Sequence, residues 1–177
     1  MNNLDIESII RKFDLNGIFQ GCHPSDKIQP LRPRTVTIYN TSNSDIEMGH
    51  STAVFCGEDP VKKPESKTCV YFDPFGTIPE NFQLVQEILR FTPNLKYCNV
   101  QLQSIFSELC ALHVLYAVIL YCNQHSVEEI FTRFYHPNTA DEFFNDRIVY
   151  HALLPELKLL KGGENLSDTF SPVLKFE

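Results

Sequence analysis

The chain has 177 residues, of which 43% are hydrophobic and 21% are charged. This composition is typical of a globular protein and excludes a disordered chain, and the length predicts one domain over residues 1–177. The net charge of −7 is unfavourable for general affinity to nucleic acid. No apolar run of about 18 residues is free of polar breaks, so we expect no membrane span.

The predicted elements begin with a helix and continue with strands. Apolar residues at helical period predict a helix over residues 3–13, after an N-terminus that lacks the pattern of a secretory signal. Residues 19–34 are dense in proline and polar side chains, which predicts a loop. Three segments rich in β-forming residues predict strands over 34–40, 50–56 and 67–73, with an exposed hairpin loop between the last two.

The second half of the chain is mostly helical. We expect a helix over 79–91 with Pro79 in its first turn, a strand over 95–101, a long apolar helix capped by Ser107, and amphipathic helices over 127–136 and 140–154. Residues 161–177 are low in periodicity and are expected to form a surface tail. The pattern predicts an α+β fold with a mostly antiparallel central sheet flanked by helices.

The six cysteines do not form a metal-binding or CxxC pattern. They are Cys22, Cys56, Cys69, Cys98, Cys110 and Cys122, and four of them lie inside apolar runs. We therefore expect buried free thiols in an intracellular, reducing compartment, with no disulfide framework and no metal site.

His50 and Asp73 stand at positions that antiparallel pairing would bring together. His50 begins one predicted strand, and Asp73 ends the next. The start of one strand lies beside the end of its antiparallel neighbour, so the carboxylate should lie next to the imidazole. Taken alone, Asp73 in the DPFG segment also fits an ordinary turn.

Cys110 is predicted to lie about three residues into the long apolar helix. Backbone N–H groups and the helix dipole favour a thiolate there, and comparable settings lower a thiol pKa to roughly 3.5–7.5. Gln103, in the preceding loop, has an amide that can donate to a carbonyl under attack. Each residue also has a structural explanation, Cys110 in the core and Gln103 bonded to a loop carbonyl. We expect His113, inside the segment ALHVLYAVI, to be packed rather than catalytic.

The ordered set of motifs resembles a known family. GH before a strand, YFDPFG after the next, and QSIFSELC resemble the adenovirus maturation protease (adenain) family, with its members in Polinton/Maverick elements and virophages, within the class that includes the SUMO proteases. GCHPSDKIQP and IYNTSNSD also resemble N-terminal signatures of the transposon and virophage members. The resemblance covers roughly residues 17–125.

The resemblance implies a role for each residue of the set. His50 would be the base, Asp73 the acid that orients it, Cys110 the nucleophile and Gln103 the oxyanion donor. Two positions depart from the family pattern. Relatives usually carry Trp after the histidine and Gly after the cysteine, where this chain has Ser51 and Ala111.

The implied function is that of a cysteine endopeptidase that cleaves viral or transposon-encoded capsid precursors. It would act as a monomer in a virion or virus factory and require no cofactor. Two alternatives stay open, a protease for ubiquitin-like modifiers and a non-catalytic capsid-associated module that retains the fold. Adenoviral enzymes use DNA as a cofactor, but 22 acidic against 15 basic residues predict no strong stimulation here.

The tail contains a further pattern. Adenain-type enzymes favour a large aliphatic residue, any residue and Gly-Gly before the cut, which this chain repeats in the run Leu160, Lys161, Gly162, Gly163, Glu164. One interpretation is a flexible turn into the surface tail. The other is that residues 164–177 regulate the enzyme, either cut by another copy or packed in cis as a built-in activating peptide through Phe170, Val173, Leu174 and Phe176.

Overall fold

The structure is a computed structural model, and it describes residues 3–13, 17–45, 49–58, 67–134 and 142–160. Five strands form one sheet in the order β1-β2-β3-β4-β5. The strands are β1 (Phe19–Pro24), β2 (Thr35–Asn40), β3 (Ser51–Glu58), β4 (Lys67–Phe72) and β5 (Leu95–Tyr97). The helices are α1 (Asn3–Arg11), α2 (Phe82–Phe91), α3 (Cys110–Cys122), α4 (Val127–Phe134) and α5 (Glu142–Leu160).

The sheet is antiparallel at its centre and parallel at its edges. β3 pairs antiparallel with both β2 and β4, so that Ala53 lies opposite Ile38 on one side and Phe72 on the other. The edge strands β1 and β5 run parallel to β2 and β4. The predicted α+β class is confirmed, and the long central pairings are the antiparallel ones that the sequence predicts.

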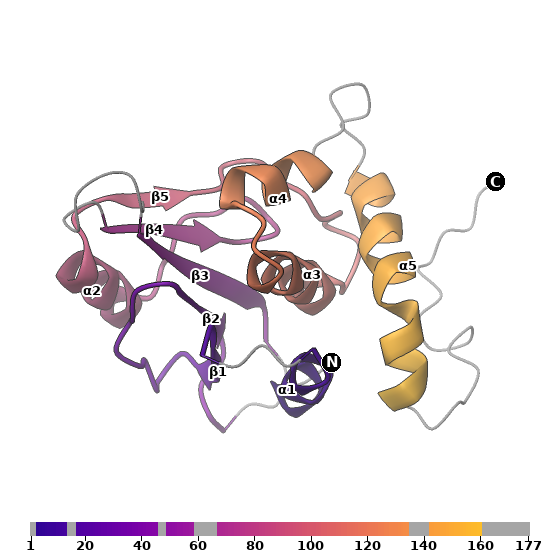
Figure 1. Cartoon of the computed structure of the whole chain (residues 1–177), viewed down its shortest axis with the longest axis horizontal. Helices are drawn as coiled ribbons and strands as arrows, with labels where there is room; N and C mark the ends of the chain where they lie inside the picture. The colour runs from indigo at the N-terminus through magenta and orange to yellow at the C-terminus, as the bar shows by residue number, and fades with distance from the viewer. Residues whose placement is uncertain (1–2, 14–16, 46–48, 59–66, 135–141, 161–177) are drawn as a thin grey trace.

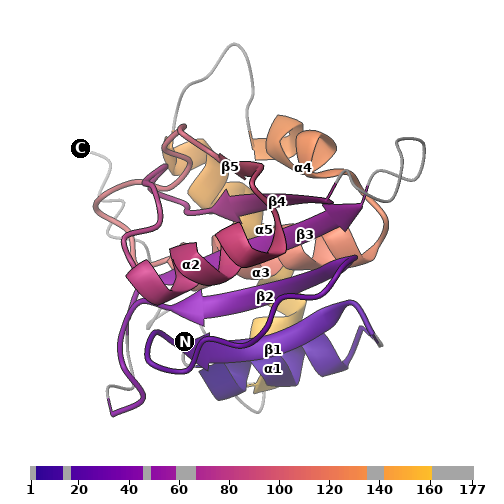
Figure 2. The ribbon, with the colours of Figure 1, turned by 90° about the vertical axis from the view of Figure 1, so that its left-hand side faces the viewer.

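Helices cover both faces of the sheet (Figures 1 and 2). Alternate residues of each strand point to opposite faces, so Ile38 and Phe72 join the core beneath α3, while Tyr39 and Tyr71 join a smaller core beneath α2. Most of α3 is buried, as expected for a helix that is apolar all round. It lies between the sheet and α5 (Figure 1). Because α3 is packed on both sides, the position of its first residue is fixed.

The predicted loop over 19–34 is partly wrong, because residues 19–24 form β1. Its sequence carries no period-2 pattern, and its register shifts between Phe19 and Cys22, where Gly21 has a φ of +117°. Hydrogen bonding to β2 supplies the order that local propensity does not. The tail over 161–177 and most of the loop between β3 and β4 lie outside the described residues.

Helix α2 begins later than expected. α2 starts at Phe82 rather than with Pro79 in its first turn, because Asn81 caps it and accepts a hydrogen bond from the N–H of Leu84 at 2.9 Å.

In the described part of the chain, no helix is both long and apolar enough to cross a membrane.

Candidate active site

The antiparallel pairing of β3 and β4 brings His50 and Asp73 into contact. His50 Nε2 donates to Asp73 Oδ1 at 2.7 Å. A carboxylate only accepts hydrogen bonds, so the contact places a proton on Nε2. Nδ1 is then the ring nitrogen that can interact with a second partner on the other side of the ring. The Asp73 side chain is buried, and that of His50 is 21% exposed. The pair therefore stands at one end of the inner strands β3 and β4, with the His50 ring partly exposed.

The turn after Asp73 holds its carboxylate in place. The N–H of Phe75 donates to Asp73 Oδ1 at 2.8 Å, and the hydroxyl of Thr77 donates to Asp73 Oδ2. Gly76 has a φ of +71°, and a Cβ there would lie 2.7 Å from the carbonyl carbon of Val100. Only glycine fits this close approach. DPFG is thus a turn, as its sequence suggests, and the same turn fixes Asp73.

Cys110 is the first residue of α3, which corrects the predicted start of this helix. The cap is Leu109, whose side chain makes no capping hydrogen bond, and not Ser107. Ser107 belongs to a separate turn, in which its N–H and its hydroxyl both donate to the carbonyl of Ser104. The thiol of Cys110 consequently lies at the very N-terminus of a buried helix, where the backbone N–H groups lack intrahelical partners.

Cys110 and His50 shift each other's pKa in the directions that an ion pair requires. Burial raises the pKa of the thiol, but the His50 ring and the backbone N–H groups of Ser51 and Ala111 outweigh it and lower that pKa below its ordinary value. Burial likewise lowers the pKa of His50, and interactions with Asp73 and Cys110 overcome this and raise it from 6.5 to about 9. Nε2 is held by Asp73, and the buried Nδ1 has no hydrogen-bond partner in the described structure, so Nδ1 is the nitrogen left for the thiol.

Asp73 is ionised in this setting. Burial raises its pKa, but hydrogen bonds from His50, Thr77 and the N–H of Phe75 lower it below the ordinary value. A carboxylate, an imidazole and a thiol thus stand in series. This arrangement can hold a thiolate and an imidazolium together at pH values between the lowered pKa of the thiol and the raised pKa of the imidazole.

Gln103 is buried in the loop that leads into α3. Its side-chain Nε2 donates to the carbonyl of Ser107 at 2.7 Å, and Oε1 has no hydrogen-bond partner in the described structure. The opposite amide orientation would set Oε1 against another oxygen, so the neighbouring carbonyl fixes which way the amide points. One hydrogen of the amide holds this orientation and the second remains for another acceptor.

The loop that carries Gln103 is locked to the turn that carries Asp73. The carbonyl of Pro74 accepts hydrogen bonds from the N–H of Leu102 at 2.8 Å and of Gln103 at 3.0 Å. Residues from two separate motifs are therefore held in one rigid unit beside α3.

His113 is buried, as expected, with its Nδ1 3.1 Å from the carbonyl of Leu109. It does not face Asp73. All six cysteines are free, and Cys110 is the one that is not fully buried. Among the residues that the structure describes, no group of three or more His, Cys, Asp or Glu side chains is placed to hold a metal ion.

Three residues support the site without a clear signal in the sequence. The Phe75 ring stacks on the His50 ring with centroids 4.8 Å apart, Thr77 holds Asp73, and the backbone N–H of Ser51 faces the thiol. Thr77 is an ordinary residue for a turn, and nearly every residue has a backbone N–H, so the sequence does not single out Thr77 or Ser51. Only the position of Phe75 inside DPFG could have drawn attention.

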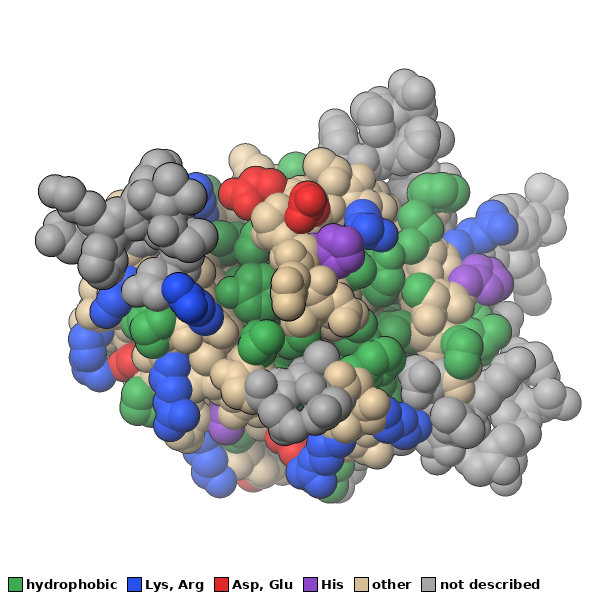
Figure 3. All heavy atoms as spheres, in the orientation of Figure 1, with side chains coloured by type: hydrophobic (Ala, Val, Ile, Leu, Met, Phe, Trp, Pro, Cys, Tyr) green, Lys and Arg blue, Asp and Glu red, His purple; other side chains and the backbone are tan. Residues whose placement is uncertain are grey.

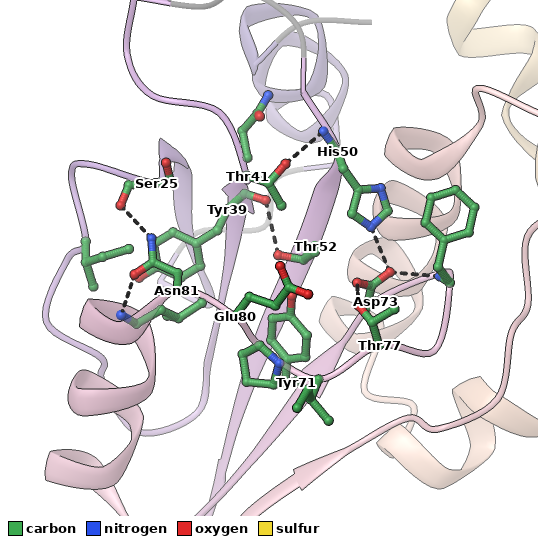
Figure 4. Close-up of a pocket in the computed structure, with 16 residues that line it drawn as sticks. Ser25, Tyr39, Thr41, His50, Thr52, Tyr71, Asp73, Thr77, Glu80 and Asn81 are labelled. Atoms are coloured by element: carbon green, nitrogen blue, oxygen red, sulfur yellow. Dashed lines mark hydrogen bonds and ion pairs between the residues drawn. The ribbon is translucent and has the colours of Figure 1, made fainter. Parts of the chain in front are cut away.

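A pocket of about 540 Å³ opens beside the His50–Asp73 pair, on the α2 face of the sheet (Figure 4). Tyr39, Thr52 and Tyr71 rise from three strands, and Glu80 and Asn81 lie on the segment that leads to α2. Its lining combines apolar and polar side chains, and one carboxylate of the lining, Glu80, is exposed. His50, Asp73 and Phe75 all belong to the lining of this pocket.

Comparison with known proteins yields matches to solved structures only. No protein-family model and no curated protein matches the sequence. The fold is similar to two crystal structures of ASFV pS273R protease, one of them of the selenomethionine protein. Both are 14% identical to this chain, with TM-scores of 0.48 and 0.49; the matches cover 82% and 81% of this chain, which spans 66% and 65% of the protease. This similarity concerns the backbone arrangement.

Proposed function

We propose that this protein is a cysteine endopeptidase in which Cys110 is the nucleophile and His50 is the acid and base. Asp73 orients His50, and Gln103 donates to the oxyanion. The observation that carries the proposal is the arrangement around one imidazole ring. Its Nε2 is held by Asp73 at 2.7 Å, its buried Nδ1 has no other hydrogen-bond partner, and the ring contributes to the lowered pKa of the Cys110 thiol. A nucleophile, a base and an orienting acid in series are the parts that thiol-dependent acyl transfer needs.

The first half of the reaction forms a thioester. The Cys110 thiolate attacks the carbonyl carbon of the scissile peptide, which forms a carbon–sulfur bond and moves the negative charge to the carbonyl oxygen. The second amide hydrogen of Gln103 and the backbone N–H of Cys110, which has no intrahelical acceptor, stabilise that charge. The carbon–nitrogen bond then breaks, and the imidazolium of His50 gives its proton to the departing amine.

The second half restores the enzyme. Neutral His50 takes a proton from a water molecule, and the water oxygen attacks the thioester carbon. The carbon–sulfur bond breaks, Cys110 leaves as a thiolate, and the new carboxylic acid departs. His50 is again an imidazolium, so the ion pair is ready for another substrate.

The proposed substrates are viral or transposon-encoded capsid precursors. This choice rests on the resemblance of the GH, YFDPFG and QSIFSELC motifs to adenain-type enzymes. The ordered triad is shared with proteases for ubiquitin-like modifiers, which makes such conjugates the second candidate substrate.

The deciding experiment compares the parent chain with Cys110→Ala. A peptide electrophile that labels thiolates should modify the parent and not the variant, and cleavage of a capsid precursor should be lost in the variant with the fold intact. Cys122→Ala, which removes a buried thiol from the other end of α3, serves as the control and should keep labelling and cleavage.

The same panel separates the alternatives. Cleavage of a ubiquitin-like fusion but not of capsid precursors would move the function to the modifier proteases. A parent protein that is neither labelled nor active would be a non-catalytic module, and equal cleavage by Cys110→Ala and the parent would remove the whole assignment.

A further inference from the structure

Helix α5 reaches the loop that carries Gln103. Asn145 on α5 is 7% exposed, and its side-chain Nδ2 donates to the carbonyl of Leu102 at 3.0 Å. α5 stands on the far side of α3 from the sheet (Figure 1). Among the contacts described for α5, this one ends on the residue directly before Gln103.

Asn145 completes the restraint of a single peptide unit. The carbonyl of Leu102 and the N–H of Gln103 belong to the same planar amide. Asn145 holds the carbonyl at 3.0 Å, and the carbonyl of Pro74 accepts the N–H at 3.0 Å from the opposite side. Two hydrogen bonds at opposite ends fix the rotation of this plane. The plane in turn sets the direction in which the Gln103 side chain leaves the backbone.

The far end of the same loop is held in a similar way. His113 Nδ1 lies 3.1 Å from the carbonyl of Leu109, and its Nε2 lies 3.4 Å from Asp146 Oδ1, beside Asn145 on α5. Buried polar side chains therefore lie at both ends of the loop over residues 102–109, Asn145 at Leu102 and His113 at Leu109. His113 also interacts with the backbone of Leu102. Without the donor at Asn145, the buried carbonyl of Leu102 would lose its hydrogen bond to α5, and the peptide plane would be held less firmly.

We propose that Asn145 is a positioning residue for the oxyanion donor. It acts through the peptide plane between Leu102 and Gln103 and touches no reacting atom. The inference rests on the proposed function of Gln103, and it makes α5 a part of the catalytic apparatus. A purely structural role, in which Asn145 only docks α5, predicts different outcomes in the experiment below.

The first measurement needs no activity. Asn145→Leu keeps the number and branching of the side-chain heavy atoms and removes the donor. Tyr121→Phe is the matched control, because the Tyr121 hydroxyl donates to the carbonyl of Cys56 at 3.2 Å, away from this loop. Hydrogen exchange of the segment over residues 99–109 should accelerate in Asn145→Leu and stay as in the parent in Tyr121→Phe. Unchanged exchange in Asn145→Leu would overturn the proposal.

The second measurement tests the link to the reaction. Asn145→Leu should lower kcat for peptide cleavage at least tenfold, with little change in KM and an unchanged rate of Cys110 alkylation by iodoacetamide, which needs a thiolate but no oxyanion donor. In a Gln103→Ala background, Asn145→Leu should add no further loss of kcat. Additive losses, or equal falls in alkylation and cleavage, would show that Asn145 serves only the fold.

Two further outcomes are distinguishable. If Asn145→Leu does not fold, the same measurements are made on Asn145→Ala. The smaller alanine side chain removes the donor without a steric clash. If the parent cleaves no peptide, the proposed function fails, and the exchange measurement alone decides whether Asn145 holds the loop.

Discussion

The contact between His50 and Asp73 determines which nitrogen of the imidazole serves the nucleophile. Nε2 donates to Asp73 Oδ1 at 2.7 Å, and this leaves Nδ1 for the thiol of Cys110. The ring cannot turn over without breaking a short, charge-assisted hydrogen bond. The acid therefore controls both the orientation of the base and its proton affinity, and each can be tested separately.

Replacing Asp73 by Asn should lower turnover strongly and leave the thiol reactive. The amide keeps the size of the side chain but removes the charge that orients and stabilises the imidazolium. We expect kcat to fall by about 10²- to 10⁴-fold, while small electrophiles still label Cys110. Rates equal to those of the parent would mean that YFDPFG is only a turn. Asp26→Asn, which alters a carboxylate bonded to Ser44 on the surface, is the control.

The pH dependence of kcat/KM should follow the thiolate–imidazolium pair. Activity rises with pH as the thiol, with its lowered pKa, loses its proton, and falls as His50, with a pKa raised to about 9, loses its own. The alkaline limb should lie near pH 9 in the parent and shift to lower pH in Asp73→Asn, because Asp73 is a main cause of the raised pKa. An alkaline limb that does not move would contradict the contact.

The same raised pKa has a consequence for stability. The proton on His50 binds more tightly in the folded state than in the unfolded state. Its contribution to the free energy of unfolding is fully present below the ordinary pKa of 6.5 and is lost as the pH rises through about 9.

Duplex DNA should not strongly stimulate cleavage. The chain has 22 acidic and 15 basic residues, which is unfavourable for binding phosphates. Figure 3 shows Lys and Arg side chains along the left and lower edges of one face, with single acidic side chains among them. Cleavage rates with and without DNA at two salt concentrations check this expectation. A large, salt-sensitive increase would show that these edges act as one basic surface.

Truncation after Gly163 tests the hypothesis that the tail regulates the enzyme. Residues 161–177 lie outside the described structure, so this prediction rests on the sequence alone. If residues 164–177 act as a built-in activating peptide, the truncated protein should lose activity and regain it when the tail peptide is added. Unchanged activity and stability would leave only a surface tail after a Gly-Gly turn. A peptide of the same composition in scrambled order is the control.

The sequence by itself determined the elements that depend on residues close together in the chain. β-forming runs separated by one loop predict β3 and β4 as antiparallel neighbours, and their register then brings His50 to Asp73. The run over residues 111–120, apolar except for His113, predicts a buried helix, and this places Cys110 near its start. These features follow from side-chain period and from pairing between strands close in the chain, which a sequence shows directly.

Only the tertiary structure decided the features that depend on distant partners. β1 is ordered by its pairing with β2, although its own residues predict a loop. α3 begins at Cys110, where the carbonyl of Leu109 accepts the first helical hydrogen bonds, and the carbonyl of Ser107 accepts from the distant side chain of Gln103 instead. Asn145 meets Leu102 across 43 residues of chain. A hydrogen bond of this kind satisfies a buried carbonyl whose orientation is known only when the helices have packed, so no local pattern can predict it.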